Sequence, residues 1–202
     1  HASAIYSYTN LLKSGSDIVA LIEEQIKKTA LDLGKIDFEG VFTVENITGY
    51  CDIESLEVRN LADFKKMNFE VGFVDLKDFE KLNKLQPKAF AAVDICHLSA
   101  TCDSSETAGK MKEIAHLIRH IHFNDSLTVW RPLMPELEGG LVPGEGELGE
   151  RAFKEDIVPF IKQISKKQDV NVVIEVLHED FIKSENSKKT LKKLLAWLDP
   201  DK

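Results

Sequence analysis

The chain alternates short β-rich runs with amphipathic helical segments, and this rhythm restricts the folds that it can form. Strands are predicted at residues 41–47, 90–95, 120–124 and 170–176. Helices are predicted at residues 17–34, 76–85, 104–118, 153–164 and 187–198. Strands that alternate with helices in this way form a parallel sheet covered by helices. The sequence therefore predicts an α/β fold.

Two stretches lie outside this rhythm. Residues 50–88 are less regular, and residues 69–74 within them are predicted as either a short strand or an irregular excursion. A segment rich in proline and glycine follows Asn124 and is predicted as a long loop that reaches Gly149. No repeat or low-complexity segment marks a domain boundary, so residues 1–202 are predicted as a single domain.

Composition excludes several other classes of protein. The chain has 202 residues, of which 43% are apolar, and its 26 Lys and Arg against 34 Asp and Glu give a net charge of -8. Its apolar runs are far shorter than the roughly 20 residues of a membrane helix, so no membrane partner is expected. The acidic balance argues against a broad basic surface that wraps nucleic acid.

The cysteines indicate a reducing compartment. Cys51, Cys96 and Cys102 are odd in number and form no C-x-x-C pair, which favours neither a disulfide framework nor a zinc knuckle. We therefore expect a cytoplasmic protein. Thiolate ligation by Cys96 or Cys102, close to His97, is an alternative, but a free cysteine is more often a small core residue.

Strand parity places polar groups on one face of the predicted sheet. Alternate side chains of a strand point to opposite faces. Ala91, Val93, Ile121 and Phe123 lie on the apolar faces of their strands, which pack under the helices. The opposite faces carry Glu45, Asp94, His122 and Glu175, each near the carboxyl end of its strand. In βα proteins, active sites form at these ends.

This polar set has the chemistry of a divalent-metal site. Any one of the four residues alone is most simply a satisfied polar group at a strand end. Four in register on one face favour a cation, because a buried carboxylate without a partner is very costly. Three carboxylates and one imidazole suit Mn²⁺ or Zn²⁺, with Mg²⁺ or Co²⁺ as alternatives, and match soft Cu(I) poorly.

Five motifs occur in order, each at a predicted strand end or in the loop beyond it. They are Val44-Glu45-Asn46-Ile47-Thr48-Gly49, Val93-Asp94-Ile95-Cys96-His97, His120-Ile121-His122-Phe123-Asn124-Asp125-Ser126, Pro143-Gly144-Glu145-Gly146-Glu147-Leu148-Gly149 and Ile174-Glu175. In order and spacing they resemble the xylose isomerase-like TIM-barrel superfamily, which includes endonuclease IV and the sugar isomerases and epimerases related to tagatose epimerase.

The resemblance implies a role for each matching residue. Glu45, Asp94, His122 and Glu175 correspond to the metal ligands of the epimerase branch, where the two glutamates also act as the catalytic acid and base. His97 corresponds to a histidine that binds substrate in that branch and a further zinc in endonuclease IV. His1 resembles another zinc ligand of the endonuclease. His97, Asn124 and Arg131 are the residues expected to bind substrate, although Arg131 is equally explained as a solvated loop residue.

One departure separates the two branches. Endonuclease IV holds a third zinc with an Asp-x-His pair, and the corresponding positions here are Glu138 and Gly140. Glycine has no side chain that ligates a metal, so a three-zinc site is incomplete. The sequences of the segments around Asn124 and Gly144, in contrast, are most similar to those of the endonuclease.

Three functions follow as alternatives. The first is a metal-dependent isomerase or epimerase acting on a small sugar or sugar phosphate. The second is an endonuclease IV-like, zinc-dependent enzyme of AP endonuclease family 2 that cleaves DNA at abasic sites. The third is a catalytically silent barrel that binds metal.

The resemblance also implies a (β/α)₈ TIM barrel, which usually needs about 250 residues. Counted from the motifs, the chain covers strands 5–8 and helices 4–8, the C-terminal two-thirds of such a barrel. Half a barrel on its own leaves two unpaired parallel edges. We therefore expect about a third of the barrel to precede His1.

Overall fold

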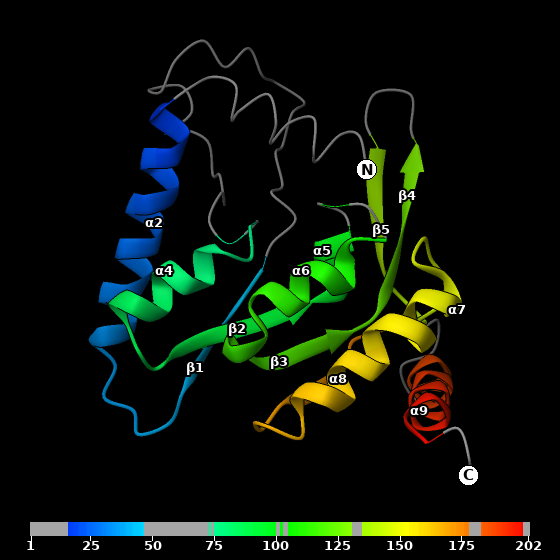
Figure 1. The fold of residues 1–202 in the computed structure, drawn as a ribbon. Coiled ribbons are helices and arrows are strands. Elements are labelled where there is room, and N and C mark those ends of the chain that lie inside the picture. Colours follow the sequence, from blue (N-terminus) through cyan, green and yellow to red (C-terminus); the bar gives the residue numbers. More distant parts are fainter. Residues whose placement is uncertain are drawn as a thin grey trace.

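The computed structural model describes residues 16–46, 73, 75–99, 102, 105–130, 135–177 and 183–199. Helices and strands alternate along these residues (Figure 1). The elements are α2 (Ser16–Gly34), β1 (Phe42–Glu45), α4 (Asp78–Leu85), β2 (Ala89–Asp94), α5 (Ile95–Ser99), α6 (Thr107–Glu113), η1 (Ala115–Leu117), β3 (Ile118–Phe123), β4 (Asp125–Trp130), β5 (Pro135–Leu141), α7 (Gly149–Ala152), η2 (Phe153–Ile157), α8 (Val158–Ile164), β6 (Asn171–Ile174) and α9 (Glu185–Leu198).

The predicted strands form one parallel sheet. Within the described part of the chain, its strand order is β1-β2-β3-β6, and every neighbouring pair is parallel. The register between β2 and β3 shifts by one residue, so that Ala91 pairs with Ile118 but Ala92 pairs with His120. Beyond this bulge Asp94 pairs directly with His122. The bulge thus brings two of the predicted ligands to the same level of the sheet.

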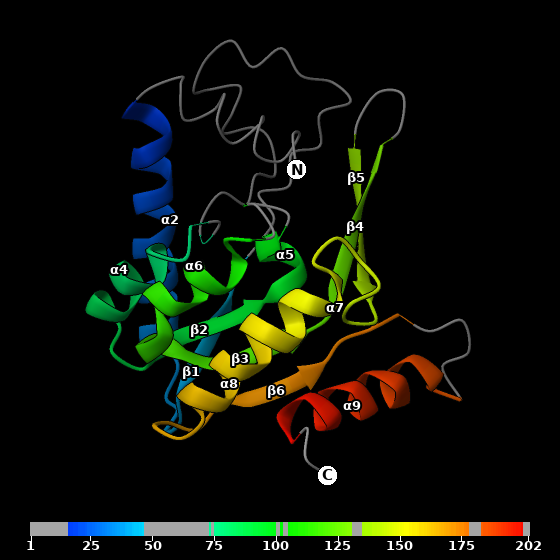
Figure 2. The same cartoon turned by 45° about the vertical axis from the view of Figure 1, so that its right-hand side comes forward.

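The apolar face of the sheet packs against the helices, as strand parity predicts. Val93, Ile121 and Phe123 are fully buried at this face. In α2, Ile22 and Ile26 recur at helical spacing and join the same core, so one stripe of the helix is buried. Figure 2 shows α6 and α8 lying along the sheet, with α9 beside β6.

Residues 153–164 are helical, as predicted, but the earlier start of the helix at Gly149 and its π-helical turn were not predicted. The helix runs from α7 through the π-helical turn η2 into α8, with Pro159 in the first turn of α8. Proline has no backbone N–H and crowds the preceding turn, so the helix widens just before it. The short helix α5, which directly follows Asp94, was not predicted either.

The predicted loop after Asn124 was also wrong in part. Strands β4 and β5 pair antiparallel from Asp125 opposite Leu141 to Trp130 opposite Pro135. This hairpin continues from the end of β3 and stands away from the parallel sheet (Figure 1). The prediction for residues 69–74 lies outside the described residues, apart from Phe73.

A parallel sheet with helices on its apolar face is compatible with a segment of a TIM barrel. That the chain is one domain covering strands 5–8 and helices 4–8 of such a barrel stays a prediction. In the described part of the chain, we find no helix with the length and apolarity needed to cross a membrane.

Candidate metal centre

The four residues predicted as ligands converge at the carboxyl end of the parallel sheet. Glu45 and Asp94 are the last residues of β1 and β2, His122 lies near the end of β3, and Glu175 directly follows β6. The His122 Nδ1 atom lies 3.3 Å from Asp94 Oδ2, 3.5 Å from Glu45 Oε1 and 2.5 Å from Glu175 Oε2. Strand parity and the parallel register therefore bring together the side chains that the sequence singled out.

The charge and spacing of these side chains are better explained by a bound divalent cation than by contacts among the side chains alone. An imidazole nitrogen carries at most one proton, so His122 Nδ1 can donate to one of the three carboxylates around it. Even with His122 protonated, three ionised carboxylates leave a net charge of −2. Ligand atoms of Asp94, His122 and Glu175 all lie within 4.8 Å of one another. Such a mixed O/N set suits Mn²⁺, Mg²⁺, Co²⁺ or Zn²⁺.

The pKa shifts show how closely these groups are coupled. Burial raises the pKa of Glu45, an effect that the nearby His122 opposes. Burial also disfavours ionised Asp94, but hydrogen bonding to His122 and the proximity of His97 outweigh it, so the pKa of Asp94 is lowered. The hydrogen bond to Asp94 raises the pKa of His122. Asp94 is thus ionised, whereas Glu45 and His122 compete for a proton.

Two asparagines hold Asp94 from opposite sides. Asn124 donates from Nδ2 to Asp94 Oδ2 at 3.1 Å and accepts the Cys96 backbone N–H at 3.0 Å. Asn46 bonds the Asp94 backbone, donating from Nδ2 to its carbonyl oxygen at 3.1 Å and accepting its N–H at 2.6 Å. The sequence motifs contained Asn46, but no role was predicted for it, because its partners are backbone atoms of a distant strand.

His97 enters the site from the middle of the short helix α5. Its side chain is about one third exposed, and its Nδ1 atom lies 3.2 Å from Glu45 Oε1. Ligand atoms of Glu45, Asp94 and His97 form a second group within 4.8 Å of one another. This second group shares Asp94 with the first, so His97 lies beside the predicted ligands. Its binding to substrate or to a second ion stays a prediction.

Asn124 is a buried residue next to the candidate centre. The residue is 3% exposed. Its amide oxygen is engaged by the Cys96 N–H, and its amide nitrogen by Asp94. The structure therefore places Asn124 behind Asp94, a candidate ligand. Its predicted contact with substrate stays a prediction.

Asp125, the first residue of β4, holds the glycine-rich loop of residues 143–149. Asp125 is fully buried and accepts hydrogen bonds from the backbone N–H groups of Ser126, Gly144, Gly146 and Leu148. Burial raises the pKa of Asp125, although these hydrogen bonds oppose the shift. A Cβ at Gly146 would lie 2.5 Å from Asp125 Oδ1, so only glycine fits there. Two of the five motifs are therefore packed directly against each other.

Cys96 and Cys102 lie in the packed interior of the fold. Both are buried thiols, 3% and 7% exposed. Burial raises the pKa of Cys96 to about 12, so this thiol stays protonated at neutral pH. The prediction that these two are small core residues is confirmed.

Several predicted residues lie outside the described part of the chain. His1 and Arg131 fall in undescribed segments, as does Cys51, and the side chain of Glu138 is not described. Gly140 lies in β5 with a φ of 73°, a left-handed conformation that favours glycine. The roles predicted for His1 and Arg131 stay predictions.

Comparison with known proteins gives little beyond this geometry. No family model and no curated protein matches the chain. One solved structure with a similar arrangement is a xylose isomerase domain protein from Planctomyces limnophilus, with 16% sequence identity and a TM-score of 0.41. The match covers 62% of this chain and 40% of that one, so it spans less than half of the length of that protein.

Proposed function

We propose that the chain is a divalent-metal-dependent isomerase or epimerase that transfers a proton next to the carbonyl group of a sugar or sugar phosphate. The observation that carries this proposal is the convergence of three carboxylates on His122 Nδ1. Glu45, Asp94, His122 and Glu175 would hold the ion. Such an ion, when bound, polarises a carbonyl oxygen and makes the neighbouring C–H more acidic.

The two glutamates are suited to proton transfer because they flank the site. In the order β1-β2-β3-β6, Glu45 comes from one edge strand and Glu175 follows the other. Their side chains are 38% and 57% exposed, whereas the Asp94 side chain is 3% exposed. One glutamate removes the substrate proton, and the other returns a proton from the opposite side.

Solvent exchange tests this proposal directly. The Mn²⁺-loaded protein is incubated in D₂O with a panel of ketoses and ketose phosphates, and deuterium at the carbon next to the carbonyl is followed by NMR. We expect incorporation into at least one substrate, and a decrease of about 10²- to 10⁴-fold in both Glu45→Gln and Glu175→Gln. The control is Glu113→Gln, an exposed glutamate of α6 that pairs with Lys77. Absence of exchange for every sugar would contradict the proposal.

A second candidate is hydrolysis of DNA at abasic sites, and one observation favours it. The group of Glu45, Asp94 and His97 lies next to the first ligand set, and hydrolytic sites often use two neighbouring ions. The net charge of -8 disfavours a DNA partner. Nicking of an abasic duplex by the wild-type protein, with loss of nicking in Glu175→Gln, would establish this activity in place of the first.

A further inference from the structure

Asn46 fastens the end of β1 to the end of β2. It is 1% exposed and directly follows Glu45. Its side chain makes the paired hydrogen bonds to the Asp94 backbone described above, and its own N–H donates to the Ala92 carbonyl at 3.2 Å. The amide group thereby continues the hydrogen-bond ladder by one step after β1 has ended. Two of these bonds hold the Asp94 main chain, and the third holds the main chain of β2 two residues earlier.

The carbonyl oxygen of Asn46 also determines the orientation of His97. His97 Nδ1 lies 2.9 Å from this oxygen and 3.2 Å from Glu45 Oε1. Both neighbours are acceptors, so Nδ1 carries the proton. The lone pair of the neutral ring is then on Nε2. The His97 backbone N–H donates to Asp94 Oδ1 at 2.9 Å, which ties the same histidine to the ligand that Asn46 holds.

We infer that Asn46 is a positioning residue that sets both Asp94 and His97 for binding. It holds the Asp94 main chain through its side chain, and it fixes His97 as the Nδ1–H tautomer through its main chain. His97 therefore offers Nε2 to a divalent cation or to a substrate hydroxyl group. This inference rests on the proposed function, because it concerns the same centre.

The amide is needed because it both donates and accepts. The Asp94 carbonyl requires a donor and the Asp94 N–H requires an acceptor, and an asparagine side chain supplies both. Alanine supplies neither, so Asn46→Ala keeps only the backbone bond to Ala92 and loosens both the hold on Asp94 and the carbonyl that orients His97. Residues that orient metal ligands commonly change metal affinity by about 10- to 100-fold when they are removed.

A matched asparagine provides the control. Asn83 in α4 donates from Nδ2 to the carbonyl oxygens of Pro87 and Ala89, at 3.2 and 2.8 Å. It thus braces the opposite end of β2 with side-chain-to-backbone hydrogen bonds of the same kind. Asn83→Ala removes a comparable brace without touching the residues of the metal centre.

The first experiment measures Mn²⁺ and Zn²⁺ affinity by calorimetry, together with Tm, for the wild-type chain and both variants. We expect both variants to lower Tm, but only Asn46→Ala to weaken metal binding, by about 10- to 100-fold. Equal affinity in the wild-type chain and Asn46→Ala would overturn the inference, as would an equal loss in Asn83→Ala. A wild-type chain that binds no ion would contradict the proposed function instead.

The second experiment needs neither a variant of Asn46 nor a metal. The tautomer of His97 is read from its ring ¹⁵N chemical shifts in metal-free wild-type protein, with the signals assigned from their loss in His97→Gln. We expect the Nδ1–H tautomer. The Nε2–H tautomer would overturn the inference whether or not the chain binds metal, so this failure is distinct from failure of the proposed function.

Discussion

At the scale of single residues, His122 links metal binding to pH. Its pKa is raised, first by the hydrogen bond to Asp94. Protonated His122 has no lone pair at Nδ1, so protons compete with the ion up to a higher pH than at an ordinary histidine. We expect Mn²⁺ affinity to fall as the pH decreases through this raised pKa. Calorimetry in buffers of different ionisation enthalpy should show proton release on binding near neutral pH.

In the metal-free chain, the raised pKa of His122 makes the folded state more stable at low pH than at high pH. A raised folded-state pKa contributes stability that is fully present below the unfolded value of 6.5 and is lost as the pH rises through the folded value. Chelator-treated wild-type protein should therefore lose more stability between pH 6 and pH 8 than His122→Asn does. If the two proteins lose stability equally, His122 is not coupled to the carboxylates.

The candidate ligands were predictable from the sequence, whereas the residues that hold them in place were not. Glu45, Asp94 and His122 could be placed on one face, near the ends of their strands, because strand parity follows from the hydrophobic pattern. The bulge that brings Asp94 level with His122 has no such pattern. Asn46 could not be placed, because an amide beyond a strand end has no characteristic pattern. Its partner Asp94 lies 48 positions away. The sequence did not predict that Asn124 is buried, for the same reason.

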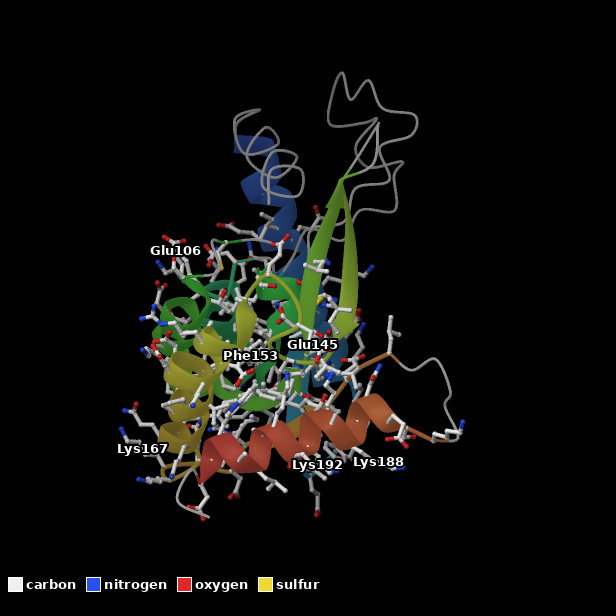
Figure 3. All side chains as sticks on the ribbon, turned by 90° about the vertical axis from the view of Figure 1, so that its right-hand side faces the viewer. Glu106, Glu145, Phe153, Lys167, Lys188 and Lys192 are labelled. Carbon is white, nitrogen blue, oxygen red and sulfur yellow. The ribbon has the colours of Figure 1, made fainter. Side chains whose placement is uncertain are left out.

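At the scale of elements, Asp125 joins β4 to the glycine-rich loop. Its carboxylate accepts four backbone N–H groups, three of them from Gly144, Gly146 and Leu148. The other side of the loop is held more weakly, because Glu145 pairs with Lys189 and Lys193 of α9 at the surface. Figure 3 shows Glu145 over α9. The buried contact should therefore dominate the order of this loop.

We expect Asp125→Ala to destabilise the protein by about 2 to 3 kcal/mol, because it leaves buried N–H groups without an acceptor. Amide hydrogen exchange at Gly144, Gly146 and Leu148 should accelerate more than exchange in β2. Lys189→Ala is the control, and its exposed ion pair should contribute less than about 1 kcal/mol. Unchanged protection of the three amides in Asp125→Ala would show that other contacts hold the loop.

The elements that sequence reasoning missed have local physical reasons. Pro135 and the glycines of β5 suggested a loop, yet proline is tolerated at the first residue of a strand, where Pro135 lies. Helix α5 has five residues, which is too short for a helical periodicity to appear. The long regular elements α2 and α9, with clear apolar stripes, were predicted within a few residues of their observed bounds.

At the scale of the whole molecule, the described strands make an open parallel sheet whose carboxyl edge carries the site. The two middle strands provide Asp94 and His122, and the outer strands lead to Glu45 and Glu175. Two overlapping groups of candidate ligands form there, Asp94 with His122 and Glu175, and Asp94 with Glu45 and His97, because the sheet is parallel and its strands end at one level. The molecule as a whole is acidic, which suits a small neutral or cation-associated substrate better than a DNA backbone.

The number of metal ions per chain tests this account most directly. Protein purified without chelator is analysed by plasma mass spectrometry, and the same count is made for Asp94→Asn and for the control Glu113→Gln. The account predicts one divalent ion per wild-type chain, one in Glu113→Gln, and a strong decrease in Asp94→Asn. Two or three ions would favour the hydrolase. A wild-type chain that holds no ion, and gains none when Mn²⁺ or Zn²⁺ is added, would contradict the central claim.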